Sequence, residues 1–97
     1  MTQNTPPARL SQAEIQHRIT ALPNWTTDGA VLQSERTFDD FPAAIAFVNA
    51  LVAPAEELGH HPDIDIRYNR VSLTLTTHDA GGLTELDFRL AEIISQL

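Results

Sequence analysis

The chain has 97 residues, enough for one small domain and too few for two separate hydrophobic cores. Six arginines and no lysine stand against 13 acidic residues, a formal net charge of −7, which disfavours binding to nucleic-acid phosphates or anionic lipid. Cysteine is absent, which excludes disulfides and thiolate metal sites, and the longest apolar stretch, Ala43 to Ala55, is too short to cross a bilayer. We therefore expect a cytoplasmic domain that binds neither nucleic acid directly nor a membrane.

The first nine residues, Met1–Arg9, contain almost nothing apolar and should form a flexible tail before a single domain over residues 10–97. Ser11 and Glu14 fit a capping box, in which each side chain hydrogen-bonds the other residue's backbone at a helix start. Apolar residues then recur at helical spacing as far as Pro23, which cannot continue a helix. The sequence predicts the first helix between Ser11 and Pro23.

Two short strands and a second helix are expected next. Asp28-Gly29 is a dipeptide typical of tight hairpin turns and lies among strand-forming residues over 25–38. A helix should follow over residues 41–58, with Pro54 either kinking it or shifting its end. Two apolar strips run along this helix, and we assign one of them to the core: Phe41, Ala44, Ile45, Val48, Val52 and Ala55. The other strip suits either self-association or packing beneath another helix, and it consists of Phe47, Leu51 and Leu58.

A hairpin gives the clearest structural signal. Apolar and polar residues alternate over 64–76 on both sides of Asn69-Arg70. With that dipeptide as a two-residue loop, the predicted pairs are Tyr68 with Val71, Ile66 with Leu73 and Ile64 with Leu75. A last helix follows, from Thr84 to Leu97. The order α-β-β-α-β-β-α predicts an α+β fold, a four-stranded antiparallel sheet with three helices packed on one face.

Three of the four histidines, His60, His61 and His78, lie at the open ends of this hairpin. The predicted register places His61 opposite His78, and Glu56, Glu57 and Asp79 add carboxylates close by. Imidazoles with neighbouring carboxylates are typical of general acid–base sites. Three imidazoles and a carboxylate could also hold zinc, but adjacent His60 and His61 would point to opposite sides of an extended chain, so we expect no metal. A purely structural role for all three histidines is the remaining alternative.

Asp87 has two interpretations. It lies in the apolar stripe of the last helix, between Leu83 and Leu90, where a partly buried carboxylate could serve a site. It also follows Thr84 by three residues and could complete a capping box with it. The residues alone favour neither interpretation.

The spacing of these residues resembles the signature of the pterin-4a-carbinolamine dehydratase family, also called 4a-hydroxytetrahydrobiopterin dehydratase. The signature runs through Glu56, His60-His61-Pro62, Tyr68, His78 and Asp87. The surrounding segments AEELGHHPDI, YNRV and LTTHDAGGLT are similar to the family as well. The resemblance covers about Leu10 to Leu97, with departures at Ile64, where an aromatic residue is frequent, and at Pro54.

The resemblance implies a dehydratase that uses neither a metal nor an organic cofactor. Its substrate would be a 4a-hydroxytetrahydropterin, which loses water to give the quinonoid dihydropterin. The implied catalytic residues are His60, His61, His78 and Asp87, with His60 and His78 as the acid–base pair. The implied pterin contacts are Glu56, His61, Pro62, Thr77, His78, Asp79 and Ala80.

Members of this family also form homodimers and homotetramers, and some act as partners of a transcription factor. The resemblance therefore implies self-association of this chain. It leaves a second functional class open, a protein-binding or assembly module that uses the same fold, with catalysis lost or incidental.

Overall fold

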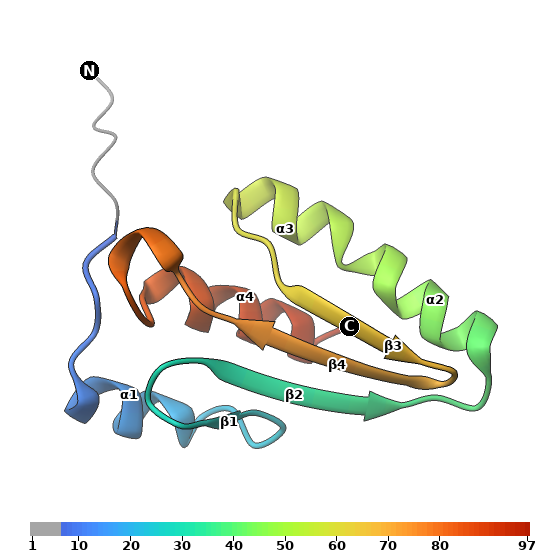
Figure 1. The fold of residues 1–97 in the computed structure, drawn as a ribbon, viewed down its shortest axis with the longest axis horizontal. Coiled ribbons are helices and arrows are strands. Elements are labelled where there is room, and N and C mark those ends of the chain that lie inside the picture. The colour runs from blue at the N-terminus through green and yellow to red at the C-terminus, as the bar shows by residue number, and fades with distance from the viewer. Residues whose placement is uncertain (1–6) are drawn as a thin grey trace.

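The computed structural model describes residues 7–97, so residues 1–6, the larger part of the expected tail, lie outside the described range. Within it, four strands form one antiparallel sheet in the order β1-β2-β4-β3, and the helices follow in the predicted order (Figure 1). The predicted α+β fold is confirmed. The elements are α1 (Gln12–Ile19), β1 (Thr26–Thr27), β2 (Leu32–Thr37), α2 (Phe41–Ala50), α3 (Val52–Leu58), β3 (Asp63–Arg67), β4 (Arg70–Leu75), the 3-10 turn η1 (His78–Ala80) and α4 (Glu85–Ser95).

Helix α1 begins at Ser11 through the predicted capping box. The Ser11 hydroxyl accepts a hydrogen bond from the Glu14 N–H at 3.1 Å, and the Glu14 carboxylate accepts one from the Ser11 N–H at 2.9 Å. The helix ends earlier than expected, at Ile19, but Leu22 and Trp25 beyond it are still buried in the core. The apolar spacing that continued past the helix therefore marks burial rather than helix length.

One face of the sheet carries the core and the other is polar. Val71, Leu73 and Leu75 of β4 are buried, whereas the alternating Ser72 and Thr74 are only partly covered. The buried strand residues pack with Ile15 of α1, Phe47 of α2 and Phe88 of α4 in one cluster. Because all helices contribute to that single cluster, they cover the same face of the sheet, as predicted.

The hairpin register differs from the prediction. Ile66 pairs with Val71 and Ile64 with Leu73, so the loop is Tyr68-Asn69 rather than Asn69-Arg70. Tyr68 takes a left-handed conformation, with φ of 53°, and is 67% exposed. The Asn69 side-chain amide donates to the Phe38 carbonyl at 2.7 Å, and the Phe38 N–H donates to the Asn69 carbonyl at 2.8 Å.

These two hydrogen bonds fix Asn69 against Phe38, which directly follows β2. They therefore favour the Tyr68-Asn69 turn over the predicted Asn69-Arg70 turn. The shift in register is by two residues, so each paired side chain stays on the same face of the sheet, and the alternation could not distinguish the two pairings. Extending the observed register pairs neither His61 nor its neighbours with His78. The predicted pairing of His61 opposite His78 is wrong.

The second helix is broken at Leu51, between α2 and α3. Pro54 is the cause, because it has no N–H to donate and its ring crowds the carbonyl of Ala50 one turn earlier. The Leu51 N–H bonds instead to the Val48 carbonyl at 3.0 Å, three residues back. The sequence predicted either a kink or a shifted helix end at Pro54. The structure instead shows an interruption at Leu51, which divides the helix into α2 and α3.

The core face of this helical pair agrees with the prediction only in part, since Ala44 and Ala55 are buried as assigned but other residues are not. Phe47 and Leu51, from the strip offered for self-association, are buried in the core. Phe41 and Val52, which were assigned to the core, are 47% and 59% exposed. Phe47 packs on Arg36, whose guanidinium lies 4.4 Å from its ring centroid, so the position of β2 decides which strip is covered. A helical period shows that two strips exist but cannot show where the sheet lies.

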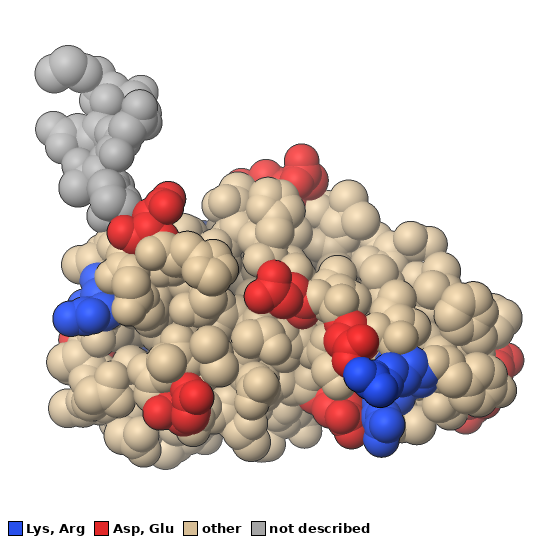
Figure 2. Space-filling view, viewed as in Figure 1, with Lys and Arg blue, Asp and Glu red and all other residues tan. Residues whose placement is uncertain are grey.

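The segment Phe41–Leu58 is long and apolar enough, by length and composition alone, to cross a membrane. Here its residues Ala44, Phe47, Leu51 and Ala55 belong to the buried core, so it forms one layer of the folded domain. On the face seen in Figure 2, basic side chains occupy separate places with acidic side chains scattered around them. That face has no continuous positive surface, in agreement with the net charge of −7.

Candidate active site

The end of α3 places His60 at the edge of the core. Gly59 closes the helix in the left-handed conformation, with φ of 60°, a backbone geometry in which glycine is unstrained. The His60 N–H then donates to the Ala55 carbonyl at 3.0 Å. This capping turn directs the chain back toward α4, and the His60 side chain is almost entirely buried.

The buried partner of His60 is Asp87 on the first turn of α4. The Nε2 atom of His60 lies 2.6 Å from Oδ1 of Asp87, whose side chain is fully buried. The other oxygen, Oδ2, accepts from the Thr84 N–H at 2.9 Å and from the Thr77 hydroxyl at 2.8 Å. Asp87 therefore caps its helix with one oxygen and binds His60 with the other, so both interpretations left open by the sequence describe its contacts.

His78 directly follows Thr77 in a closed loop after β4. The Thr77 and Gly82 backbones exchange two hydrogen bonds, of 3.2 and 3.3 Å, and the 3-10 turn η1 lies between them. Gly81 ends that turn in the left-handed conformation, with φ of 73°. His78 is exposed at the start of this loop, next to a residue that is anchored to Asp87. The loop thus places His78 one residue after the side chain that is anchored to Asp87.

His61 faces a different environment from His60, as expected for adjacent residues in an extended chain. Its Nε2 atom lies 2.5 Å from Oε2 of Glu56, and both side chains are largely exposed. Glu56, His61 and Pro62 line one side of a groove of about 250 Å³. The rest of the groove is apolar and is formed by Val48, Leu51, Val52, Ala55 and Ile64.

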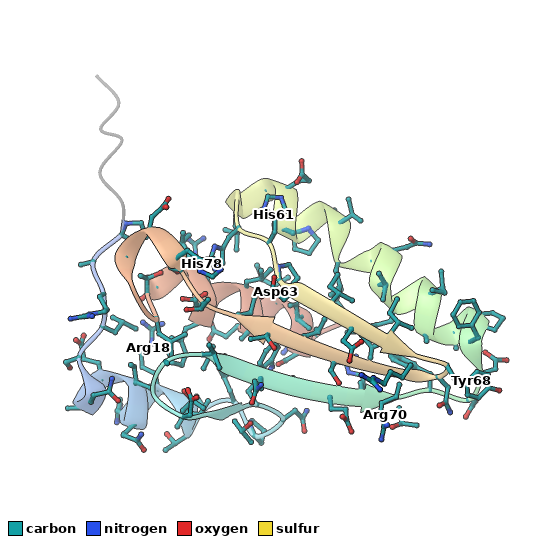
Figure 3. The ribbon with its side chains drawn as sticks, viewed as in Figure 1. Arg18, His61, Asp63, Tyr68, Arg70 and His78 are labelled. Carbon is teal, nitrogen blue, oxygen red and sulfur yellow. The ribbon has the colours of Figure 1, made fainter. Side chains whose placement is uncertain are left out.

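The side chains of His61 and His78 lie on either side of the gap between the end of α3 and the turn before α4 (Figure 3). Asp63 lies below them at the start of β3 in the same view. The structure thus brings His60, Asp87 and Thr77 into direct contact, with His61 and His78 as the chain neighbours of His60 and Thr77. Asp79 and Ala80 lie in the η1 turn.

Thr84 is the residue of this cluster that was not predicted as part of the site. It is fully buried, and its hydroxyl lies 2.8 Å from the hydroxyl of Thr77. The capping-box spacing of Thr84 and Asp87 was visible in the sequence. Contact with Thr77 was not, because it depends on how the loop between β4 and α4 closes.

The described part of the chain shows no cluster of metal ligands. Within residues 7–97, no three His, Asp or Glu side chains converge as a metal site requires. The Nε2 atoms of His60 and His61 are each engaged by a different carboxylate. The separate pairs suit proton transfer and its orientation better than shared ligation.

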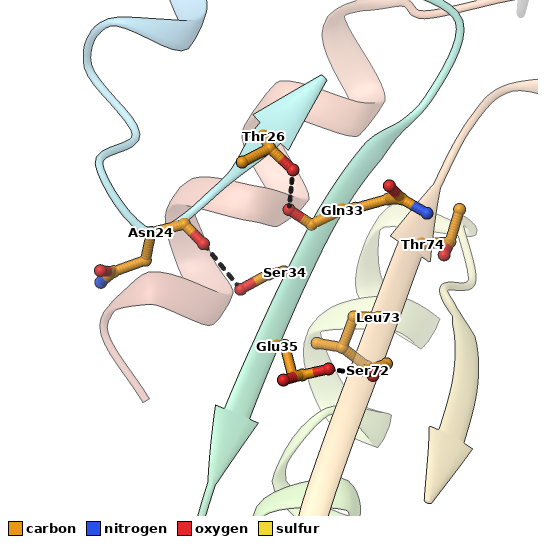
Figure 4. A pocket seen from close by; sticks show the side chains of 8 residues that line it. All are labelled: Asn24, Thr26, Gln33, Ser34, Glu35, Ser72, Leu73 and Thr74. Carbon is orange, nitrogen blue, oxygen red and sulfur yellow. Dashed lines mark hydrogen bonds between the residues drawn. The ribbon is translucent and has the colours of Figure 1, made fainter. Parts of the chain in front are cut away.

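A second hollow, of about 390 Å³, lies away from the histidines at β1, β2 and β4 (Figure 4). Several of its polar side chains already bond to neighbours: the Ser34 hydroxyl donates to the Asn24 carbonyl at 2.9 Å, and the Ser72 hydroxyl to Glu35 at 3.3 Å. The hollow contains no histidine. The histidine cluster is therefore the better candidate for acid–base chemistry.

Comparison with known proteins agrees with this site. The chain matches the family described as "Pterin 4 alpha carbinolamine dehydratase" over residues 8–97. It is 60% identical, over 91% of its length and 95% of the relative's, to a protein of Trichormus variabilis named "Putative pterin-4-alpha-carbinolamine dehydratase". A protein of Cyanothece sp. with the same name is 61% identical, over 91% of each chain.

Two solved structures extend the comparison. A "transcriptional coactivator/pterin dehydratase" from Brucella melitensis superposes with a TM-score of 0.85 at 37% identity, covering 91% of this chain and 96% of that one. A "pterin dehydratase-like protein" described as a RuBisCO assembly factor in the alpha-carboxysome gives a TM-score of 0.60 at 26% identity, covering 74% of this chain and 83% of that one. Sequence and structure together confirm the resemblance: the chain belongs to the pterin 4 alpha carbinolamine dehydratase family.

Proposed function

We propose that this protein dehydrates a 4a-hydroxytetrahydropterin to the quinonoid dihydropterin and so returns pterin used in aromatic amino-acid hydroxylation. The observation that carries the proposal is the hydrogen-bonded chain from His60 through Asp87 to Thr77, which joins the end of α3 to the residue before His78. An imidazole fixed by a buried carboxylate is a suitable arrangement for proton transfer, and His78 directly follows the residue that anchors that carboxylate.

The reaction needs one proton donor and one proton acceptor. The donor protonates the hydroxyl at C4a, and the C4a–O bond then breaks and releases water. The nitrogen at N5 supplies electrons to form the C4a–N5 double bond and gives its proton to the acceptor. Atoms and charge balance without an oxidant, a metal or an organic cofactor, and we propose that this enzyme requires none.

We assign the two proton transfers to His60 and His78, with Asp87 orienting His60. His61, paired with Glu56, and Pro62 would form one side of the pterin pocket, while Thr77, Asp79 and Ala80 would contact the pterin from the other. Each positioned acid or base is expected to contribute about a hundredfold to ten-thousandfold, or about 3 to 5 kcal/mol of barrier. A carbinolamine that loses water slowly by itself needs no greater assistance.

The direct test generates the 4a-hydroxypterin with an aromatic amino-acid hydroxylase and follows the quinonoid product by absorbance. We expect the protein to accelerate product formation above the spontaneous rate. Absence of any acceleration would contradict the proposal. The same assay after treatment with a chelator should show unchanged activity, and a loss that added zinc restores would overturn the metal-free mechanism.

A second candidate function is protein binding. It is favoured by the names of the two solved structures, one a coactivator and one an assembly factor, and by apolar side chains exposed at Phe41, Val52 and Ile64. Val52 and Ile64 line the same groove, beside β3 at the edge of the described sheet. We propose that this surface supports a homodimer or homotetramer, in the cytoplasm.

Sedimentation of the wild-type chain and of Val52→Asp tests self-association. We expect a dimer or tetramer that the substitution dissociates, whereas a wild-type monomer would contradict it. A stoichiometric protein partner whose binding survives replacement of His60 and His78 would favour the binding module as the main role.

A further inference from the structure

We propose that the groove beside His61 and Pro62 receives the C6 substituent of the pterin and selects substrates in which that substituent is short and uncharged. The inference rests on the proposed dehydratase function and names the substrate class of its site. The groove has a volume of about 250 Å³ and is lined by five apolar side chains and by Glu56, His61 and Pro62. His61 lies at the end of α3, on one side of the gap that separates α3 from the turn before α4 (Figure 3).

The groove continues the proposed pterin pocket. Glu56, His61 and Pro62, the three residues assigned to one side of that pocket, also form one side of the groove. His61 directly follows His60, one of the two residues proposed to transfer protons, and consecutive Cα atoms lie about 3.8 Å apart. A pterin held against these residues therefore has the groove next to it.

The chemistry of the ring system determines which part of a pterin fits this groove. Its pyrimidine ring carries an amide, an amine and ring nitrogens, and an apolar wall would leave these groups without hydrogen-bond partners. Carbon atoms lie at the opposite edge, at C6 and C7. C6 is bonded to N5, the atom that gives up its proton, so a C6 substituent leaves the ring beside the reacting bond. The substituent is therefore the part that can enter the groove without loss of hydrogen bonds.

The groove has a buried floor and an open mouth. Leu51 and Ala55, which line it, are 2% and 4% exposed, whereas Val52 and Ile64 are 59% and 42% exposed. A substituent placed there would remove its own surface and that of Val52 and Ile64 from water, which is favourable for apolar groups. Val52 and Ile64 are also the residues proposed for self-association. A second copy of the chain is therefore the alternative occupant of the groove.

The charge of the groove disfavours anionic substituents. Among the described residues that line it, Glu56 is the acidic one and none is an arginine. Glu56 already engages His61, with Oε2 at 2.5 Å from Nε2. A carboxylate or phosphate on the substituent would lose water against an apolar wall and would lie close to a second negative charge. A short alkyl or hydroxyalkyl substituent brings no charge to bury.

The experiment measures equilibrium binding of stable 7,8-dihydropterins by isothermal titration calorimetry. The compounds carry hydrogen, methyl, propyl or carboxylate at C6 and are otherwise identical. We expect Kd to fall by about fourfold for each carbon added, the effect of burying one methylene group. The carboxylate should bind about fivefold more weakly than the methyl compound, the effect of one like charge at about 4 Å in water.

Two pairs of variants assign these effects to the groove. Glu56→Gln should remove most of the difference between the carboxylate and the methyl compound. Glu57→Gln should retain it, because Glu57 is exposed but does not line the groove. Val52→Thr places a hydroxyl on the wall with little change of shape, so it should weaken binding of the propyl compound by up to about fourfold and leave that of the unsubstituted pterin unchanged. Ala53→Ser, which is exposed and outside the groove, is its control.

The inference is overturned if Kd does not depend on the C6 substituent, or if Glu56→Gln and Glu57→Gln have equal effects. Should Val52→Thr not fold, Ile64→Thr at the other exposed margin decides by the same criterion. Sedimentation of these variants identifies a second copy as the occupant if propyl gives no gain while Val52→Thr shifts the chain toward monomer. These results leave the dehydratase assay unaffected. If no dihydropterin binds and that assay shows no acceleration, the proposed function and the inference both fail.

Discussion

His60 and Asp87 are 27 residues apart in the chain and lie 2.6 Å apart through Nε2 and Oδ1. The contact joins the end of α3 to the start of α4. It therefore couples two helices that have no other polar link among the hydrogen bonds of residues 7–97.

Replacing Asp87 with Asn tests this contact. The amide can keep one capping interaction, but it no longer offers His60 an anion, and its NH₂ group favours the wrong tautomer of the ring. We expect kcat to fall by about a hundredfold or more, with the fold retained in circular dichroism. The control is Asp65→Asn on the exposed strand β3, which should have near wild-type kcat. Equal activity in both variants would contradict the role of Asp87.

Replacing His78 with Ala should remove most dehydratase activity and leave stability nearly unchanged. The side chain is exposed, so its loss creates no cavity and strands no buried partner. Urea denaturation should give a midpoint close to that of the wild type, while the coupled assay should show a loss of about a hundredfold. Full activity would exclude His78 as the acid or base.

The Glu56–His61 pair should matter for substrate rather than for folding. Both side chains are largely exposed, and exposed ion pairs contribute at most about 1 kcal/mol to stability. We expect Glu56→Gln to change the free energy of unfolding by less than this and to raise KM. An unchanged KM would separate this pair from the pterin pocket.

Arg18 and Glu85 link α1 to α4 in a two-contact ion pair. The hydrogen bond from Arg18 lowers the pKa of Glu85 below its usual value. The stabilisation from this pair is therefore present at neutral pH and is lost as the pH falls through that lowered pKa. We expect Glu85→Gln to cost about 0.5 kcal/mol at pH 7, since the pair is exposed. The cost should vanish in acid, and a constant difference in melting temperature across the titration would contradict this.

Gly59 is expected to resist substitution for conformational reasons. A Cβ would meet no atom within 4 Å, but φ of 60° places other residues in the left-handed region. Gly59→Ala should cost about 1 kcal/mol in chemical denaturation. Gly59→Asn should cost less, because Asn tolerates this conformation better than Ala. Equal costs would indicate a different cause.

The sequence predicted the order of elements and both capping boxes because these depend on neighbouring residues. It could not determine the hairpin register, since pairing Ile66 with Leu73 or with Val71 leaves each side chain on the same face of the sheet. The turn was decided by the contact of Asn69 with Phe38, which lies 31 residues away in the chain. The core face of α2 likewise depended on the position of β2.

The candidate site could likewise be predicted only where it depends on residues that are close in the sequence or on the family resemblance. Spacing and resemblance indicated His60, His78 and Asp87, and the capping box indicated that Thr84 and Asp87 interact. The contact between the hydroxyls of Thr77 and Thr84 depends on the backbone exchange of Thr77 with Gly82, which closes the loop. No pattern of neighbouring residues in the sequence predicts that these two backbones hydrogen-bond to each other.

The Asp87 carboxylate caps the start of α4 and also binds His60, so the geometry of the site depends on the local stability of that helix end. Helix ends open more often than helix centres, without unfolding of the sheet. Opening of the first turn of α4 would release Asp87 and leave the imidazole unoriented while the rest of the domain stays folded. Amide hydrogen exchange at residues 84–87 would accordingly measure what fraction of the time Asp87 is in place to orient His60.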